Sequence, residues 1–446
     1  MKFNNIKSHM LNTIVVVMLL SGFNSCKIDD QVDPNNPSLE GIEANATVDE
    51  LNNLVTGMLS GMRNRFDTYL DDMSVIGRDY YRYSGSDPRF TSDLLGKESS
   101  VLDPNTFYTT NPWADHYRIV RNGWILRHAV ANTTAALTDE EKNGYLGFAK
   151  TIQAQQMLNA LNMQYQNGIR VDVEDADNPG PFLSYEQSLQ GILDLLDQGY
   201  TDLTNGGDAF KFTLTSGFAG FDTPSTFAKF NRALAARVTL YEGDFSGVEA
   251  VLNQSFFDLA GALTTGVYMV YSTSGGDLLN DAYTPLNSST GSNARCAQPS
   301  FNADAEPGDL RVASKTVLRD EPAFADDLTS NYDVWVYKSN VDPVCIIRNE
   351  ELILIYAEAK NQTGNSSAAI EAINVIRAAA GLSIYSGSTS QDEVTNEILN
   401  QRRYSLFAEG HRWVDMRRYN KLGELPIDRP GDDVWVQFPR PANEEL

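Results

Sequence analysis

The feature of this sequence that most constrains its fold is a series of helix-start signals, each followed by an amphipathic stretch. A Ser or Thr placed three residues before a Glu or Gln can cap a helix, because the two side chains satisfy two backbone N–H groups that the helix itself leaves unpaired. Such pairs precede periodic apolar stretches at Thr47 with Glu50, Thr138 with Glu141, Ser184 with Gln187, and Ser390 with Glu393. A Thr223-Pro224 pair predicts a further start, with proline at the first helical position.

The apolar residues that follow these starts recur at i, i+3, i+4 and i+7, which is typical of helices with one buried face. They group into three helical hairpins, and Gly381 is predicted to end the last helix of the most regular one. The hairpins pair residues 352–359 with 369–376, residues 227–241 with 245–253, and residues 119–130 with 154–165. Ala, Gly and Tyr recur in hairpins of this length, as in the 34-residue tetratricopeptide repeat.

Two long stretches, about 75–112 and 258–343, have little periodicity, and the second is rich in Ser, Thr, Gly, Asn and Asp. Structureless segments this long are uncommon in compact domains and are usually functional where they occur. We therefore expect a mainly α protein, with a tetratricopeptide-like scaffold of helical hairpins that carries long irregular ligand-binding loops. Residues 26–446 are expected to form one domain.

The first 25 residues are typical of a secretory signal, with Lys2 and Lys7 followed by an apolar run from Ile14 to Leu20. Cys26 follows directly, as in a bacterial lipobox, where the thiol is acylated. An ordinary signal with an incidental cysteine is the alternative. Several acyl chains anchor a protein stably to a membrane. The sequence thus predicts a lipid anchor at Cys26. The remaining cysteines, Cys296 and Cys345, are compatible either with a disulfide or with two free thiols.

The charge and the motifs exclude several functions. A formal net charge of −24 repels phosphates, so nucleic acid is not expected as a partner. The sequence lacks a phosphate-binding Gly-Lys-Ser/Thr loop and a Gly-x-Ser-x-Gly elbow, and its histidines are not at metal-ligand spacing. We expect no catalytic residue, metal or cofactor. The pairs Asp71-Asp72 and Asp326-Asp327 are interpreted as a solvated acidic face, with calcium binding as the alternative.

Aromatic and arginine side chains gather in the two unpatterned stretches. A sugar offers an apolar C–H face that stacks on a ring and hydroxyl groups that bond to polar side chains. The alternative is that these rings fix the loops to the scaffold. The predicted ligand-binding residues are Arg78, Tyr80, Tyr81, Arg82, Arg89, Trp113, Tyr283, Arg311 and Trp335.

The C-terminal motifs resemble those of the SusD/RagB family of Bacteroidetes outer-membrane lipoproteins. The similar segments are Arg402-Arg403, Glu409-Gly410-His411-Arg412, Asp415-Met416-Arg417-Arg418 and Phe438-Pro439-Arg440-Pro441. These motifs are interpreted as structural, made of ion pairs and caps between helices. The resemblance implies a lipid-anchored protein of the outer-membrane surface that captures glycans, breaks no bond, and acts as a lid on a SusC-like TonB-dependent transporter.

Three other functions remain compatible with the sequence. The first is capture of peptides for a RagAB-like importer. The second is an interaction scaffold without a small ligand, as tetratricopeptide arrays often are. The third is a glycoside hydrolase, since paired carboxylates are recognised by their geometry and not by their spacing in sequence.

Overall fold

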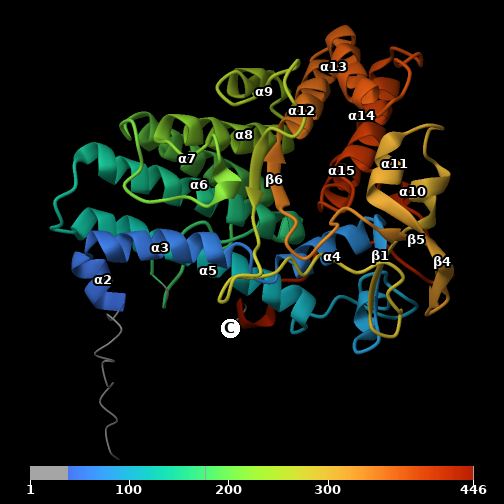
Figure 1. Ribbon diagram of the computed structural model, residues 1–446, viewed down its shortest axis with the longest axis horizontal. Helices are drawn as coiled ribbons and strands as arrows, with labels where there is room; N and C mark the ends of the chain where they lie inside the picture. The colour runs from blue at the N-terminus through green and yellow to red at the C-terminus, as the bar shows by residue number, and fades with distance from the viewer. Residues whose placement is uncertain (1–38, 176, 445–446) are drawn as a thin grey trace, which may run out of the picture.

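The computed structural model describes residues 39–175 and 177–444, and Figure 1 shows the arrangement of its elements. The predicted signal segment and Cys26 lie outside the described residues. The α-helices are α2 Leu39–Asn45, α3 Val48–Gly61, α4 Phe66–Ile76, α5 Phe107–Asn132, α6 Asp139–Gln164, α7 Tyr185–Thr204, α8 Pro224–Glu242, α9 Phe245–Leu252, α10 Pro299–Ala303, α11 Leu310–Lys315, α12 Asn349–Gln362, α13 Ser366–Ala379, α14 Gln391–Ser405 and α15 Arg412–Arg418. The strands are β1 Tyr80–Ser84, β2 Gly266–Met269, β3 Asn293–Ala297, β4 Thr316–Ala325, β5 Leu328–Val334 and β6 Val344–Arg348. Short 3-10 turns are η1 Pro88–Phe90, η2 Tyr165–Asn167, η3 Ser216–Phe218, η4 Leu422–Glu424 and η5 Ala442–Glu444.

The predicted helix starts are confirmed at all five places. Thr47, Thr138 and Ser184 form reciprocal capping boxes with the Glu or Gln three residues later. Thr223 caps α8 ahead of the proline, although its partner in the box is Thr226. Ser390 precedes α14 but its side chain makes no capping hydrogen bond.

The helical hairpins stack side by side into the predicted tetratricopeptide-like scaffold. Helix α6 packs between α5 and α7, and α7 in turn packs on α8, which Figure 1 shows as a layered array. Helix α6 is buried on most of its surface. Gly147 makes the close packing possible, because a Cβ atom there would lie 2.9 Å from the carbonyl oxygen of Gly199 in α7. A second, smaller apolar cluster lies among α12, α13 and α14.

The two unpatterned stretches contain most of the strands. Strands β1, β3, β5 and β4 form an antiparallel sheet in that order, and β2 pairs with β6. The apolar pattern of the sequence does not predict this sheet. Strand β1 is buried on both faces over residues 80–83, so it lacks the alternation of apolar and polar residues that marks a half-exposed strand. The two stretches that were expected to be irregular are therefore partly ordered as strands.

The C-terminal motifs form a buried ion-pair network, as interpreted from the sequence. Asp415 of α15 accepts hydrogen bonds from Arg402 of α14 at 2.7 Å and from Arg418 at 2.9 Å. Arg418 also donates to Glu358 of α12 at 2.7 Å, and Glu358 is fully buried. The guanidinium groups of Arg402 and Arg418 lower the pKa of Asp415 against the effect of its burial. The network joins three helices that are separated in sequence.

Replacement of Asp415 by alanine leaves the buried Arg402 without its ion-pair partner. Removing one partner of a buried pair costs about 3–5 kcal/mol, so we expect Asp415→Ala to lower the free energy of unfolding by that amount in chemical denaturation. Glu371→Ala removes an exposed carboxylate on α13 and serves as a control expected to change stability by less than about 0.5 kcal/mol. Equal effects of the two substitutions would contradict the role of the network.

Asp79, between α4 and β1, is a buried carboxylate with few groups to stabilise its charge. One of its oxygens accepts a hydrogen bond from the backbone N–H of Ala408 at 3.2 Å, while the other has no partner among the described residues. Burial raises the pKa of Asp79 to about 7, and the charge of Arg412 opposes this rise only in part. The folded protein therefore binds a proton at Asp79 over a pH range where the unfolded chain has lost it.

We expect this proton to make stability depend on pH. An unfolded Asp has a pKa of about 3.9, so between about pH 4 and 7 the folded state holds the additional proton and stability falls as pH rises. The contribution is complete below pH 4 and lost above 7. Asp79→Asn removes the titration, and its unfolding free energy relative to wild type should rise by up to about 1.4 kcal/mol per pH unit in that window. The prediction is refuted if the difference in unfolding free energy between the two proteins, measured by chemical denaturation, stays constant from pH 4 to 8.

Candidate functional site

Two loops, residues 270–287 and 335–343, are joined by the buried side chain of Asn280. The Asn280 backbone N–H donates to the carbonyl oxygen of Asn340 at 2.8 Å, and its side-chain amide donates to that of Asp342 at 2.8 Å. Its side-chain oxygen accepts a hydrogen bond from the N–H of Ala282 at 3.0 Å. One residue thus fixes the position of both loops relative to each other.

These loops carry a pair of half-buried rings. The ring centroids of Tyr283 and Trp335 are 6.3 Å apart, and the Nζ atom of Lys338 lies 5.3 Å from the Trp335 ring. Tyr283 packs against the main apolar core, whereas Trp335 belongs to neither apolar cluster of the described residues. Leu279 and Val341, on the same loops, are 41% and 37% exposed. We refer to Leu279, Tyr283, Trp335, Lys338 and Val341 as the aromatic platform.

A surface groove of about 370 Å³ begins at the residues that follow Trp335. Tyr268 and Pro343 contribute apolar surface to it, and Asp342, Arg348 and Glu350 contribute charge. Arg348 is paired with Glu350 at 2.8 Å. The volume is within the range of small-ligand sites, which combine apolar walls with a few polar groups. The platform and groove together offer the ring faces and hydrogen-bonding edges that a sugar requires.

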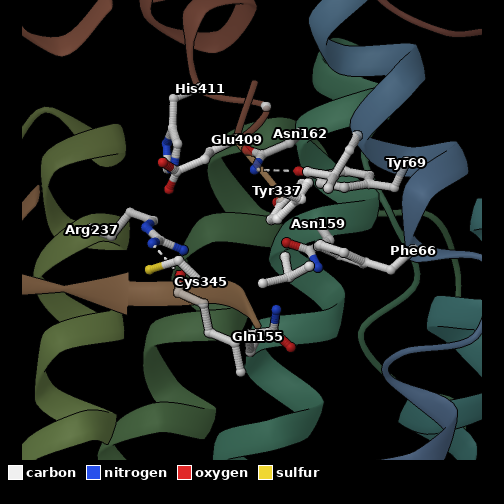
Figure 2. Close-up of a pocket in the computed structure, with 14 residues that line it drawn as sticks. Phe66, Tyr69, Gln155, Asn159, Asn162, Arg237, Tyr337, Cys345, Glu409 and His411 are labelled. Atoms are coloured by element: carbon white, nitrogen blue, oxygen red, sulfur yellow. Dashed lines mark hydrogen bonds between the residues drawn. The ribbon is translucent and has the colours of Figure 1, made fainter. Parts of the chain in front are cut away.

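A more enclosed cavity lies inside the protein, between α4, α6, α8 and β6 (Figure 2). Its walls include polar side chains such as Asn159, Arg237 and His411, and Asn162 donates a hydrogen bond to the Tyr69 hydroxyl at 3.4 Å. The cavity has a volume of about 30 Å³, which is enough for one or two water molecules. This cavity is too small for a sugar ring.

Arg78, predicted as a ligand-binding residue, is buried and acts as a clamp on the backbone. It has a left-handed conformation, with φ of 59°. Its guanidinium group donates to five carbonyl oxygens from three parts of the chain. These acceptors are Val75 at 3.3 Å, Ile76 at 3.1 Å, Leu95 at 3.4 Å, Pro426 at 3.1 Å and Asp433 at 2.6 Å. These contacts occupy every nitrogen of the guanidinium group within the protein.

Tyr80 and Arg82 are buried around the carboxylate of Asp71. Asp71 accepts hydrogen bonds from the Tyr80 hydroxyl at 2.7 Å and from Arg82 at 3.0 Å. Arg295 of the neighbouring strand β3 donates to both oxygens of Asp71, at 2.6 and 2.8 Å. These groups satisfy one another and hold α4 against the sheet.

The side chains of Tyr81, Trp113 and Arg311 are also buried. The indole N–H of Trp113 donates to Glu444 at 3.0 Å, and its ring stacks on Tyr117 with centroids 4.2 Å apart. Arg311 pairs with Asp309 at 2.6 Å. Six of the nine predicted residues therefore have structural contacts in place of an open face, as in the alternative interpretation of the rings. Their role in binding remains an untested prediction.

Arg89, Tyr283 and Trp335 are the predicted residues that reach the surface. Arg89 is paired with Asp87 at 2.6 Å and lies over the Phe107 ring, and no described contact joins it to the Tyr283–Trp335 pair. Lys338 and Tyr268 were not among the residues predicted from the sequence. Neither has a motif around it. Tyr268 reaches the groove because β2 pairs with β6, and Lys338 reaches the platform because it lies three residues after Trp335 on the same loop.

The expected acidic face is wrong for Asp71 and Asp72, whereas Asp327 is exposed as predicted. Asp71 and Asp72 are buried, and Asp326 is paired with Lys97 and with Arg429. Within the described residues, no group of three His, Cys, Asp or Glu side chains is placed to hold a metal ion. Cys296 and Cys345 are free thiols. No helix of the described segments combines the length and apolarity needed to cross a bilayer.

Comparison with known proteins links the chain to one family. Residues 326–437 match the SusD family model. A SusD-like protein of Formosa agariphila is 36% identical over 117 residues, which make up 22% of this chain and 23% of that protein. The chain therefore spans about a quarter of this curated relative.

Solved structures resemble the chain over most of its length. A SusD superfamily protein from Bacteroides vulgatus has a TM-score of 0.64 at 16% identity, over 89% of this chain and 96% of its own. Surface glycan-binding protein A from Bacteroides thetaiotaomicron, solved with laminarihexaose, has a TM-score of 0.67 at 14% identity, over 90% of this chain and 97% of its own. A SusD-like carbohydrate-binding protein from Bacteroides vulgatus has a TM-score of 0.62 at 16% identity, over 84% and 83%. These matches confirm the resemblance to the SusD/RagB family and the predicted fold.

Proposed function

For this SusD-family chain, we propose the function of a cell-surface glycan-binding protein that uses the aromatic platform and the adjoining groove. The platform is the observation that carries the proposal, because the Trp335 ring is partly exposed and lies outside the apolar cores. Sugars bind to such rings through their apolar C–H faces. The laminarihexaose complex of a protein with the same fold supports the ligand class. The proposed activity is binding, without cleavage of a bond.

The groove next to the platform favours a neutral glycan. Its charged side chains are largely paired with each other, as Arg348 is with Glu350, so they offer hydrogen bonds without a strong local field. The chain as a whole carries −24, which disfavours polyanions. A segment of a neutral polysaccharide or an oligosaccharide is therefore the proposed ligand.

The proposed location and partner rest on the sequence. Acylation of Cys26 would place the protein at the outer membrane, on the cell surface. Delivery of the glycan to a SusC-like TonB-dependent transporter is the step that the family resemblance implies. Peptide capture for a RagAB-like importer is the alternative that the binding experiment below distinguishes.

We expect a soluble protein that starts after Cys26 to be retarded in gels containing one or more neutral polysaccharides. Trp335→Ala and Tyr283→Ala each remove a stacking surface, and each should weaken binding about tenfold, as for central aromatic residues in other interfaces. Tyr385→Ala removes a half-buried ring that packs on the smaller cluster and should leave retardation unchanged. Affinity gel electrophoresis with a panel of neutral and acidic polysaccharides measures this.

Free migration in every gel, together with capture of peptides, would replace the glycan proposal by the peptide alternative. Retardation that survives both substitutions would keep glycan binding but refute the platform as its site. Release of reducing ends from a retarding polysaccharide would show a hydrolase.

A further inference from the structure

A second groove lies on the surface between α14, α15 and the turn η4. It has a volume of about 380 Å³. Residues Asn396, Asn400 and Arg403 line it from α14, at the spacing that places side chains on one helix face. Arg412 lines it from α15 and Lys421 from the start of η4. No residue of this groove lines the groove beside the platform.

The groups in this groove have unused hydrogen-bonding capacity. Among the described residues, no hydrogen bond or ion pair satisfies the side chains of Asn396, Asn400 or Arg412, and the Nε atom of Arg412 is buried without a partner. The buried arginines of the described residues each have at least one hydrogen-bonded partner, as Arg402 has in Asp415, although the two terminal nitrogens of Arg402 are unpaired. Arg412 is half-buried and has no hydrogen-bonded partner at any of its nitrogens within the described part of the chain. The guanidinium group supplies only donors, whereas each amide supplies two N–H donors and one carbonyl acceptor. The groove can therefore donate to an anion and exchange hydrogen bonds with hydroxyl groups.

The charges that face the groove sum to a positive local potential. Arg403, Arg412 and Lys421 are cations, while Glu424 is the one acid lining the groove and is paired with Lys421 at 2.6 Å. Asp304 pairs with Arg403 from outside the groove at 3.1 Å. Asp79 acts on Arg412 through its charge but makes no ion pair with it. Burial and the charge of Arg403 together lower the pKa of Arg412 to about 10.

From these contacts we propose that the groove is a binding site for a small organic carboxylate, such as an acidic monosaccharide. The fork of Arg412 matches a carboxylate group with two parallel hydrogen bonds. The amides of Asn396 and Asn400 supply bonds for hydroxyl groups, and Leu399 and Met416 give the groove an apolar wall. The volume exceeds that of an inorganic anion. This site is separate from the proposed glycan platform, so either can fail without the other.

Isothermal titration calorimetry with sodium glucuronate, at constant ionic strength, tests the proposal. Glucose serves as the neutral analogue and sodium sulfate as the inorganic anion. We expect glucuronate to bind, and sulfate and glucose to bind at least tenfold more weakly. Arg412→Gln should weaken glucuronate binding tenfold or more, because a hydrogen bond to a charged group is lost. Asn400→Asp, which places an acid in the groove at a half-exposed position, should have the same effect.

Lys229→Gln is the matched control, because it removes one positive charge from an exposed position on α8. It should change glucuronate affinity by less than twofold. The proposal is overturned if glucuronate does not bind, if glucose or sulfate binds as well as glucuronate, or if Arg412→Gln and Asn400→Asp both bind like wild type. Circular dichroism of each variant shows whether it is folded. If Arg412→Gln does not fold, glucuronate binding by Asn400→Asp decides the test.

Discussion

The fold depends on the compensation of buried charge between segments that are distant in sequence. Arg237 of α8 pairs with Glu351 of α12 at 2.6 Å, with both side chains buried. The Asp415 network then joins α12 to α14 and α15. A buried ion is costly unless its partner is placed accurately. These pairs therefore favour the one arrangement of α8, α12, α14 and α15 in which each buried charge lies beside an opposite charge.

The same requirement explains the region between α4 and the sheet. Arg78 and the Asp71 cluster use backbone carbonyls and carboxylates to satisfy arginines that have no access to water. Arginine fits these positions because its planar fork donates in several directions at once. Arg78, Tyr80 and Arg82, which were predicted to bind a ligand, therefore hold α4 and the sheet together. The proposed ligand surface lies on the two loops that Asn280 joins.

The scaffold was predictable because its signals are local. A capping box and the apolar period of the following helix act within a few residues, so Thr138 and the helix after it can be interpreted together. The sheet was not predictable in this way, since β1 is buried on both faces and finds its partner β3 more than 200 residues later. Burial also determines which of the predicted ligand-binding residues reach the surface. Tyr80 and Tyr283 look alike in sequence, but the pairing of β1 with β3 buries Tyr80 next to Asp71, whereas Tyr283 lies beside Trp335 in a half-exposed loop.

The attachment of both platform loops to Asn280 affects the thermodynamics of any ligand that binds there. A surface that must be ordered by its ligand loses conformational entropy on binding, and that loss is subtracted from the affinity. Here the buried amide has already removed that freedom during folding. Ligands would then be selected by how well they fit the shape and separation of the rings. Differences in affinity would arise from slow dissociation more than from closure of the loops around the ligand.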